Sequence, residues 1–388
     1  MWFLVLFFAV YWLMHLTVFG VSAGQLGLST RVWWMIVPMS LALSLTPLGA
    51  AVLPETLPRW ILKPVWWLIY TWLGILFYLF CAQAGYVLLR RIAQWGPPSL
   101  QNFFVPRPIW FVALVLVVFF VVGYGVYEAK QRFHVTRLEI PVASLQRPLR
   151  LVFFSDLHLG LMPGFGRLED LVRLCRLETP DGVLIAGDLL NDHIGFLDRE
   201  KALMRELRTY APVWAVLGNH EVYAGEAAAL TWYQEAGVRV LSNTSALLTI
   251  DPRVRVTGVD DPAAGQGSLQ QRLALALPQA LDSPELHILL SHSPRGWPEA
   301  VPPDVDLMLS GHTHQGQMFP FSWVVKLAYP HIYGLYSRDE KRLLVSRGAG
   351  TWGPPFRVLA PPEAFVLEFI PHQDAGGADG KTSPSHGQ

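Results

Sequence analysis

Cysteine and charged residues are both scarce in this 388-residue chain. Its two cysteines are Cys81, in a long apolar segment, and Cys175, in a stretch with helical spacing, so no disulfide framework is expected. Charged residues make up 15% of the chain, and 30 basic and 30 acidic side chains give a formal net charge of zero. Nucleic-acid binding by charge requires an excess of basic residues, so nucleic acid is not an expected partner.

The shortage of charge is greatest before Glu128, where six basic residues and one acidic residue are the charged side chains. A bilayer core about 30 Å thick needs about 20 apolar residues of helix for each span. We therefore predict a transmembrane region over residues 1–127 with about four helices. Pro38 and Pro47 predict a kink or break in the second of them. The predicted spans are residues 1–19, 32–53, 65–89 and 109–127.

The apolar segments have two weaker interpretations. A buried helical domain of a soluble protein fits poorly, because four such segments in succession carry so few charges. A cleaved signal peptide fits poorly as well, because the first segment lacks a positively charged start. We expect a multi-pass protein of the cell (inner) membrane. With four spans, the side that carries the C-terminal domain has five basic residues near the membrane against four on the other, which favours a cytoplasmic C-terminal domain.

The remaining chain divides into a polar connector (128–148), an α/β domain (149–370) and a disordered tail (371–388). Helical spacing at 168–177, 197–210 and 224–236 alternates with runs of β-forming residues. Later strands lie closer together, and they fit either two sheets packed face to face or one mixed sheet. These later strands are predicted at 246–250, 254–259, 286–290, 307–309, 342–346 and 364–369.

Five short motifs of metal-binding residue types each follow a run of β-forming residues. Side chains at the carboxyl ends of parallel strands meet at one edge of a sheet, where they supply enough oxygen and nitrogen donors for two adjacent metal ions. One such motif alone would be weak, but five in succession indicate an enzyme. The motifs are Asp156-Leu157-His158, Gly187-Asp188, Gly218-Asn219-His220-Glu221, Ser291-His292 and Gly311-His312-Thr313-His314.

In this order the motifs resemble the D-x-H, G-D, G-N-H-E/D, H and G-H-x-H pattern of the calcineurin-like metallophosphoesterases. The segment 346–351 looks like the closing segment of a membrane-associated bacterial subgroup, which includes UDP-diacylglucosamine phosphodiesterases. Gln315 departs from the small residue that often follows G-H-T-H in this subgroup. The resemblance implies an α/β fold, a four-layer α/β/β/α sandwich, preceded here by an all-α transmembrane region.

The resemblance also implies the metal ligands. Two divalent ions roughly 4 Å apart can hold a bridging hydroxide and neutralise phosphoryl oxygens, and Asp188 would be the bridging carboxylate. Mixed nitrogen and oxygen ligands favour manganese, iron or zinc over calcium or magnesium. The first ion would be completed by Asp156, His158 and His314, and the second by Asn219, His292 and His312.

Other residues would act beside the metals. By resemblance, His220 would hydrogen-bond the phosphate and assist departure of the leaving group. Glu221 would support the loop, and Asp192 would either orient a ligand or be an ordinary loop residue. Arg347 follows a strand in a Gly-rich segment, so it would either bind substrate phosphate or form a structural salt bridge.

We therefore predict a membrane-anchored di-metal phosphodiesterase or pyrophosphatase acting on a phosphate ester. Lipid-linked phosphates are favoured because anchoring places enzyme and substrate in one plane, while cell-envelope polymers and nucleotides are alternatives. A non-catalytic scaffold would be expected to have lost ligands, above all His220. A transporter with a regulatory domain would carry ionisable residues in its spans, where only His15 lies. The helices are thus predicted to be mainly an anchor, so that a chain beginning near Phe133 would fold and act alone.

Overall fold

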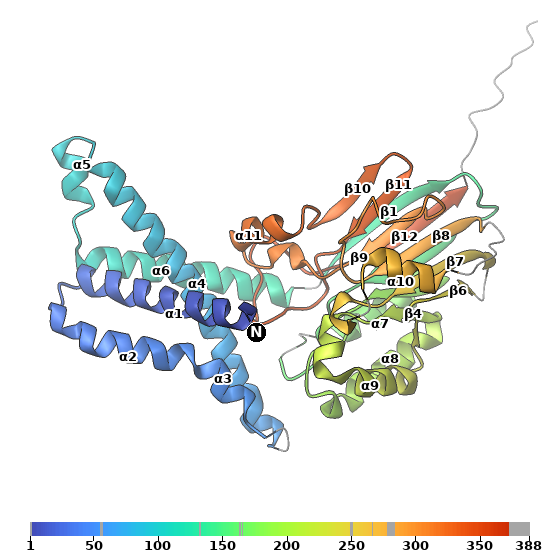
Figure 1. Ribbon diagram of the computed structural model, residues 1–388, viewed down its shortest axis with the longest axis horizontal. Coiled ribbons are helices and arrows are strands. Elements are labelled where there is room, and N and C mark those ends of the chain that lie inside the picture. Colours follow the sequence, from blue (N-terminus) through green and yellow to red (C-terminus); the bar gives the residue numbers. More distant parts are fainter. Residues whose placement is uncertain are drawn as a thin grey trace, which may run out of the picture.

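The computed structural model describes residues 2–54, 57–131, 133–162, 164, 166–248, 251–265, 267–277 and 284–371. Its two parts are a group of long N-terminal helices and an α/β sandwich (Figure 1). The tail predicted from residue 371 lies outside the described residues, except for Pro371 at the end of the last strand.

Four segments of the described N-terminal part are long and apolar enough to cross a membrane: Leu4–Gln25, Thr30–Ala51, Arg59–Ala93 and Pro108–Lys130. Each coincides with one predicted span. The second is interrupted at Leu45, and Pro47 is the second residue of the next short helix, whereas Pro38 lies inside a continuous helix. The helices are α1 (Trp2–Gln25), η1 (Thr30–Val32), α2 (Trp33–Ser44), α3 (Thr46–Ala51), α4 (Arg59–Ala93), α5 (Pro98–Phe103) and α6 (Pro108–Lys130).

In the described residues, the sandwich contains two six-stranded sheets. In the first, β2 to β5 run parallel, β12 is antiparallel to β2, and β1 pairs in parallel with β12 at the edge. Its order is β1 (His134–Val142), β12 (Glu363–Pro371), β2 (Leu149–Phe154), β3 (Gly182–Ala186), β4 (Val213–Val216) and β5 (Arg239–Val240). The second has the order β10 (Gly334–Arg338), β11 (Lys341–Val345), β9 (Leu307–Ser310), β8 (Leu286–Ser291), β7 (Asp251–Val259) and β6 (Thr244–Leu248).

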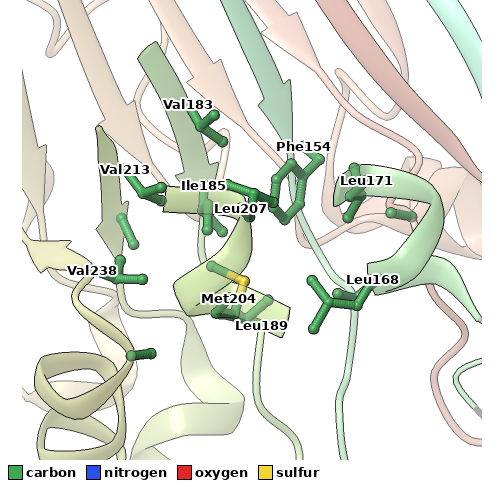
Figure 2. Close-up of a cluster of buried hydrophobic side chains, with 14 of the residues drawn as sticks. Phe154, Leu168, Leu171, Val183, Ile185, Leu189, Met204, Leu207, Val213 and Val238 are labelled. Carbon is green, nitrogen blue, oxygen red and sulfur yellow. The ribbon is translucent and has the colours of Figure 1, made fainter. Parts of the chain in front are cut away.

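Alternation along the strands divides their side chains between two cores. In β2, Leu151 and Phe153 face the second sheet, while Val152 and Phe154 face the outer helices. Figure 2 shows the outer core, where Phe154 and Ile185 lie near Met204 of the helical layer. That layer consists of α7 (Arg167–Glu178), α8 (Asp198–Tyr210) and α9 (Asn219–Ala236).

The second sheet is covered on its outer face by α10 (Leu269–Ala276), which packs on strand residues such as Leu289 and Met308. The four layers are therefore α/β/β/α, which confirms the predicted fold class. Short helices complete the domain: η2 (Ile194–Phe196), η3 (Pro262–Ala264), η4 (His314–Gly316) and α11 (Phe321–Ala328).

The predicted connector 128–148 needs correction, because it contains β1. Residues 134–142 pair along their whole length with β12, so this segment belongs to the sheet. Its alternation of Val135, Arg137 and Glu139 with half-buried or buried residues is typical of an edge strand. The prediction also omitted β5, β10, α10 and α11.

The helices and the sandwich pack against one another. Phe356, which is fully buried, and Val358 lie in a loop of the sandwich and contact a cluster that contains Tyr78 of α4 and Val118 of α6. At the start of α4, Arg59 donates a hydrogen bond of 3.0 Å to the carbonyl of Phe196.

Candidate metal centre

The five motifs follow strands of both sheets, β2 to β4 from one and β8 and β9 from the other. Several of their residues adopt left-handed backbone conformations, which cost on the order of 1–3 kcal/mol each for non-glycine residues. Strain of this kind persists only where the surrounding structure fixes it, and it gathers at functional sites. These residues are Asp156 (φ 53°), His158 (φ 51°), Asp188 (φ 51°), His312 (φ 69°) and His314 (φ 49°).

One cluster of donors consists of Asp156, His158 and His314, whose nearest donor atoms all lie within 4.8 Å of one another. The Nε2 atoms of the two histidines are 3.0 Å apart, and His314 Nε2 is 3.4 Å from Asp156 Oδ1. Asp156 is fully buried. Burial and the nearby Asp188 raise the pKa of Asp156 to about 7, against the opposing effect of His292. A cation at this position would favour the carboxylate form.

A second cluster joins Asn219, His292 and His312. Asn219 Oδ1 lies 2.9 Å from His312 Nδ1 and 3.2 Å from His292 Nε2, and these two nitrogens are 3.1 Å apart. His292 Nδ1 donates to the carbonyl of Ala186 at 2.8 Å. In a neutral ring that bond leaves a lone pair on Nε2, which points at the cluster, as in metal-binding histidines.

Asp188 lies between the two clusters. Its Oδ2 is 3.1 Å from His292 Nε2 and 3.8 Å from His158 Nε2. Although burial opposes ionisation, the adjacent His292 holds the pKa of Asp188 well below its usual range. Gly218 leaves room for this carboxylate, because a Cβ there would clash with Asp188 Oδ1 and lie 2.8 Å from its Cγ. Asp188 is therefore placed where a single carboxylate could contact two ions.

His220 begins α9 beside the clusters. Its backbone N–H donates to Asp188 Oδ1 at 2.9 Å, and its ring centroid is 4.7 Å from that of His158. On the outer side its ring contacts Tyr223 at 5.7 Å and the half-exposed Trp352 at 5.8 Å. Burial lowers the pKa of His220, and Asp188 opposes this effect. The imidazole thus lies between the buried donors and the solvent, where a substrate would enter.

Comparisons with known proteins agree with this geometry. The family model described as calcineurin-like phosphoesterase matches residues 149–316. An uncharacterized metallophosphoesterase of Campylobacter jejuni is 31% identical over 265 residues, which cover 68% of this chain and 70% of the relative. The chain belongs to the calcineurin-like metallophosphoesterases. It is therefore a metal-dependent phosphoesterase, which confirms the predicted enzyme class.

Two further relatives show how far the likeness extends. A metallophosphoesterase of Aquifex aeolicus is 34% identical over 224 residues, covering 56% of this chain and 84% of the relative. A transmembrane protein with metallophosphoesterase domain from Danio rerio is 29% identical over 356 residues, covering 85% of this chain and 78% of the relative. The second match is too long to be confined to the sandwich, so it includes part of the N-terminal helices. Together with the four apolar helices, it identifies this phosphoesterase as a membrane protein.

Glu221 supports the loops that carry the candidate ligands. Its carboxylate accepts hydrogen bonds from the backbone nitrogens of Gly218 (2.7 Å), Leu190 (2.8 Å) and Asp188 (3.1 Å), and from the Tyr233 hydroxyl (3.0 Å). Asp192 has a similar loop role, because it accepts from the backbone nitrogen of Leu161 at 2.8 Å.

Arg347 makes two contacts within the sandwich. Its guanidinium pairs with the buried Glu363 at 2.6 Å and lies 4.2 Å over the ring of Tyr333. Of the two roles predicted for it, the structure contains the salt bridge. A contact between Arg347 and substrate phosphate stays a prediction.

The sequence-based reading of the phosphoesterase missed two neighbours of the clusters. The Tyr329 hydroxyl lies 2.7 Å from His312 Nε2, and the buried Arg357 guanidinium lies 3.1 Å from His314 Nδ1. Arg357 can only donate, so His314 Nδ1 accepts in this geometry, whereas the second nitrogen of a metal-binding histidine usually donates. His314 is therefore the donor whose contacts match a metal ligand least closely.

Proposed function

We propose that the protein is a membrane-bound phosphodiesterase or pyrophosphatase that holds two divalent ions. The observation that carries the proposal is the position of Asp188, whose Oδ2 lies within 4 Å of a histidine from each cluster. The assigned ligands are those of the two clusters described above, Asp156, His158 and His314 for one ion and Asn219, His292 and His312 for the other.

The donor set fits divalent cations. Two buried carboxylates close to each other are costly unless positive charge offsets them, as the raised pKa of Asp156 reflects. Imidazole and carboxylate donors together favour manganese, iron or zinc over calcium and magnesium. When bound, such ions would polarise the phosphoryl oxygens and lower the pKa of a coordinated water.

The residues of the chain itself would position the phosphate. His220 lies beside the donors and toward the open side, so its ring can hydrogen-bond a phosphate oxygen or the leaving-group oxygen. The hydrogen bond from its backbone N–H to Asp188 fixes the position of the backbone that carries the ring. Glu221 holds the Asp188 and Gly218 backbones together, which keeps the neighbouring ligands in register.

A substrate attached to a membrane lipid is supported by the packing of the sandwich on the helices. The same loop that contains Arg357, beside His314, contains Phe356, which packs against α4. The backbone nitrogen of Arg357 also donates to the carbonyl of Gly125, five residues before the end of α6. This loop therefore brings the site near the end of that span, where the head group of a lipid-linked phosphate would be found. Enzyme and substrate in one plane also have a high effective concentration.

The sandwich is proposed to lie on the cytoplasmic side of the cell (inner) membrane. Arg59, at the start of α4, donates to the carbonyl of Phe196 and lies 5.6 Å over its ring, so this basic end of the span is on the sandwich side. Basic residues near the membrane favour the cytoplasm. A fluorescent-protein fusion after Gln388 should fluoresce, and an exported-phosphatase fusion there should be inactive; the reverse pattern would place the domain outside.

The activity is tested with the purified full chain and manganese. We expect hydrolysis of bis(p-nitrophenyl) phosphate to exceed that of p-nitrophenyl phosphate, to stop with EDTA, and to accompany about two metal ions per chain. Asp188→Asn should lose both metal and activity, whereas Asp304→Asn, a control carboxylate that pairs with His287, should keep both. Full metal content and normal turnover in Asp188→Asn would contradict the assignment.

A further inference from the structure

The segment that follows Gly311-His312-Thr313-His314 exposes an unusual amount of apolar surface. Helix α11 has no buried residue, although most of its sequence, Phe-Ser-Trp-Val-Val-Lys-Leu-Ala, is apolar. Trp323 is 63% exposed, Val324 54% and Leu327 88%, and Phe319 just before the helix is also exposed. We call these four residues the α11 surface. Contiguous apolar surface of this kind indicates an interaction site.

The α11 surface continues the surface of the membrane helices. The Tyr78 hydroxyl of α4 donates to the carbonyl of Phe319 at 2.9 Å, and the rings of Phe77 and Phe321 are 5.9 Å apart. Figure 1 shows α11 between the helical part and the sandwich. Phe77 and Tyr78 belong to a span, so their contacts place the start of α11 against a helix that crosses the bilayer.

A neighbouring loop shows that the sandwich reaches the depth of the spans. Phe356 packs so closely on Gly74, in the middle of α4, that a Cβ there would clash with its ring. The backbone nitrogen of Arg357 donates to the carbonyl of Gly125 at 3.0 Å. Gly125 precedes the end of α6 by five residues, or about 7–8 Å of helix. This part of the sandwich therefore lies beside the membrane-spanning part of α6, inward from the end of that helix.

Both ends of α11 lead to the candidate metal centre. On one side, η4 contains His314, and on the other Tyr329 contacts His312 Nε2 at 2.7 Å. Trp352, half exposed beside His220, is linked to the same segment, because its backbone N–H donates to Gln317 Oε1 at 2.8 Å. The apolar surface and the site are thus parts of one continuous stretch of chain.

We propose that the α11 surface is inserted into the bilayer that the N-terminal helices span, and that it contacts the acyl chains of a lipid whose phosphate enters the metal centre. The second part of this inference, contact between α11 and the acyl chains of the substrate, is called the substrate half below and rests on the proposed function. The bilayer already surrounds α4, which α11 contacts. Lys326, the charged residue of α11, suits the phosphate head groups at the surface of the acyl region.

The position of α11 is tested by the depth of single labels. In a Cys81→Ala background, with the buried Cys175 retained, Leu327→Cys and the control Leu275→Cys on α10 each receive an environment-sensitive fluorophore. The full chain is placed in vesicles of phosphatidylethanolamine and phosphatidylglycerol that carry nitroxide on the acyl chains. The label at 327 should be quenched and that at 275 should not. Equal, weak quenching at both positions would overturn the proposal.

A second copy of the chain is the competing occupant. If α11 contacts lipid, energy transfer between donor-labelled and acceptor-labelled Leu327→Cys chains should fall to zero as the ratio of lipid to protein is increased. Transfer that persists at high dilution, together with absent acyl-chain quenching, would show that a second copy covers the α11 surface.

The substrate half is tested by comparing two phosphodiesters. Dioleoyl phosphatidyl-p-nitrophenol in the same vesicles reports a lipid substrate, and bis(p-nitrophenyl) phosphate reports a soluble one. In Leu327→Asp the ratio of lipid to soluble turnover should fall about tenfold or more, since a loss of about 1.4 kcal/mol of lipid contact gives that factor. Leu275→Asp should keep the ratio of the unmodified chain.

The outcomes separate the two proposals. If the unmodified chain hydrolyses neither phosphodiester, the proposed function is wrong and the substrate half falls with it, while the quenching still decides whether α11 lies in the bilayer. If both substrates are cleaved and Leu327→Asp leaves the ratio unchanged, the proposed function stands and the role of α11 in lipid substrate binding is wrong.

Discussion

The guanidinium of Arg357 lies 3.1 Å from Nδ1 of His314. The same fully buried arginine donates from its backbone nitrogen to Gly125 of α6. One residue thus contacts both a candidate metal ligand and a membrane-spanning helix. The helices of this protein therefore do more than hold the phosphoesterase at the membrane, because they fix the position of a loop on which the site depends.

Arg357→Lys should lower both thermal stability and metal retention. The guanidinium donates to the carbonyls of Gly350, Ala360 and Arg347 as well as to His314. A lysine amine cannot serve all these acceptors, and each buried acceptor left without a donor costs about 1–3 kcal/mol. Unfolding temperature and metal content of the purified chain measure the effect. Arg150→Lys, a partly exposed arginine paired with Glu368, is the control. Equal effects of both substitutions would show that Arg357 has no special role.

The sequence predicted which candidate ligands lie together because each motif is local. A strand, a short turn and one or two donors suffice to place a side chain at the edge of a sheet, and the order of the motifs then identifies the family. The supporting role of Glu221 was predicted from the family resemblance, and the structure places it on the first turn of the helix that Asn219 begins.

The residues that were missed act across long separations. Arg357 and Tyr329 carry no motif, and their roles arise only when the chain after η4 closes over the clusters. The sequence predicts a connector in place of β1 because its partner, β12, is the last strand of the described residues and lies far away in the sequence. Of the two prolines predicted to break the second span, Pro47 lies two residues after the break at Leu45, while Pro38 lies inside a continuous helix. A proline removes only one helical hydrogen bond, and an apolar helix can tolerate that loss.

His220→Ala should lower kcat by roughly 10²–10⁴ for phosphodiesters with poor leaving groups while most of the metal is retained. Although His220 could join His158 and Asp188 around an ion, each assigned cluster has three other donors, so loss of its ring should affect the phosphate more than the ions. Good leaving groups, such as p-nitrophenolate, should suffer less because they depart without a proton. His134→Ala, at the exposed start of β1, is the control. Loss of metal, or an equal loss for all leaving groups, would give His220 another role.

The stabilisation by divalent ions should increase with pH between about 5 and 7. Burial, together with Asp188, raises the pKa of Asp156 to about 7, so the folded metal-free protein binds a proton that the unfolded chain releases near 3.9. As the pH rises toward 7, the metal-free protein therefore loses the stability that the protonated Asp156 contributes. A bound ion requires the carboxylate form of Asp156, so it offsets this loss. Burial lowers the pKa values of His158 and His312 to about 3, so these rings are already neutral in this range.

The measurement is the difference in unfolding temperature with and without manganese at a series of pH values. The difference should rise between pH 5 and 7 and keep rising above pH 7. Against the effect of burial, Asp188 raises the pKa of His292 well above its usual value, and this ring must also lose a proton to bind an ion. The same series with calcium is the control, because its preference for oxygen ligands predicts a smaller gain at every pH. A difference that does not change between pH 5 and 8 would contradict the assignment of Asp156 as a ligand.

Removal of the N-terminal helices should damage the phosphoesterase domain, contrary to the expectation from the sequence that they are mainly an anchor. A chain that begins at Phe133 would expose Phe356 and Val358 to water, at a cost of roughly 1.5–3 kcal/mol for each large side chain. It would also leave the Arg357 nitrogen without its acceptor on Gly125. We expect this truncated chain to aggregate, and the soluble fraction to unfold at a lower temperature and to retain less metal than the full chain in detergent. Truncation combined with Phe356→Ser and Val358→Thr should restore solubility but not metal retention, since Arg357 would still lack its contact with α6. A truncated chain that is soluble without these changes, and that binds metal and hydrolyses bis(p-nitrophenyl) phosphate as the full chain does, would show that the helices serve only as an anchor.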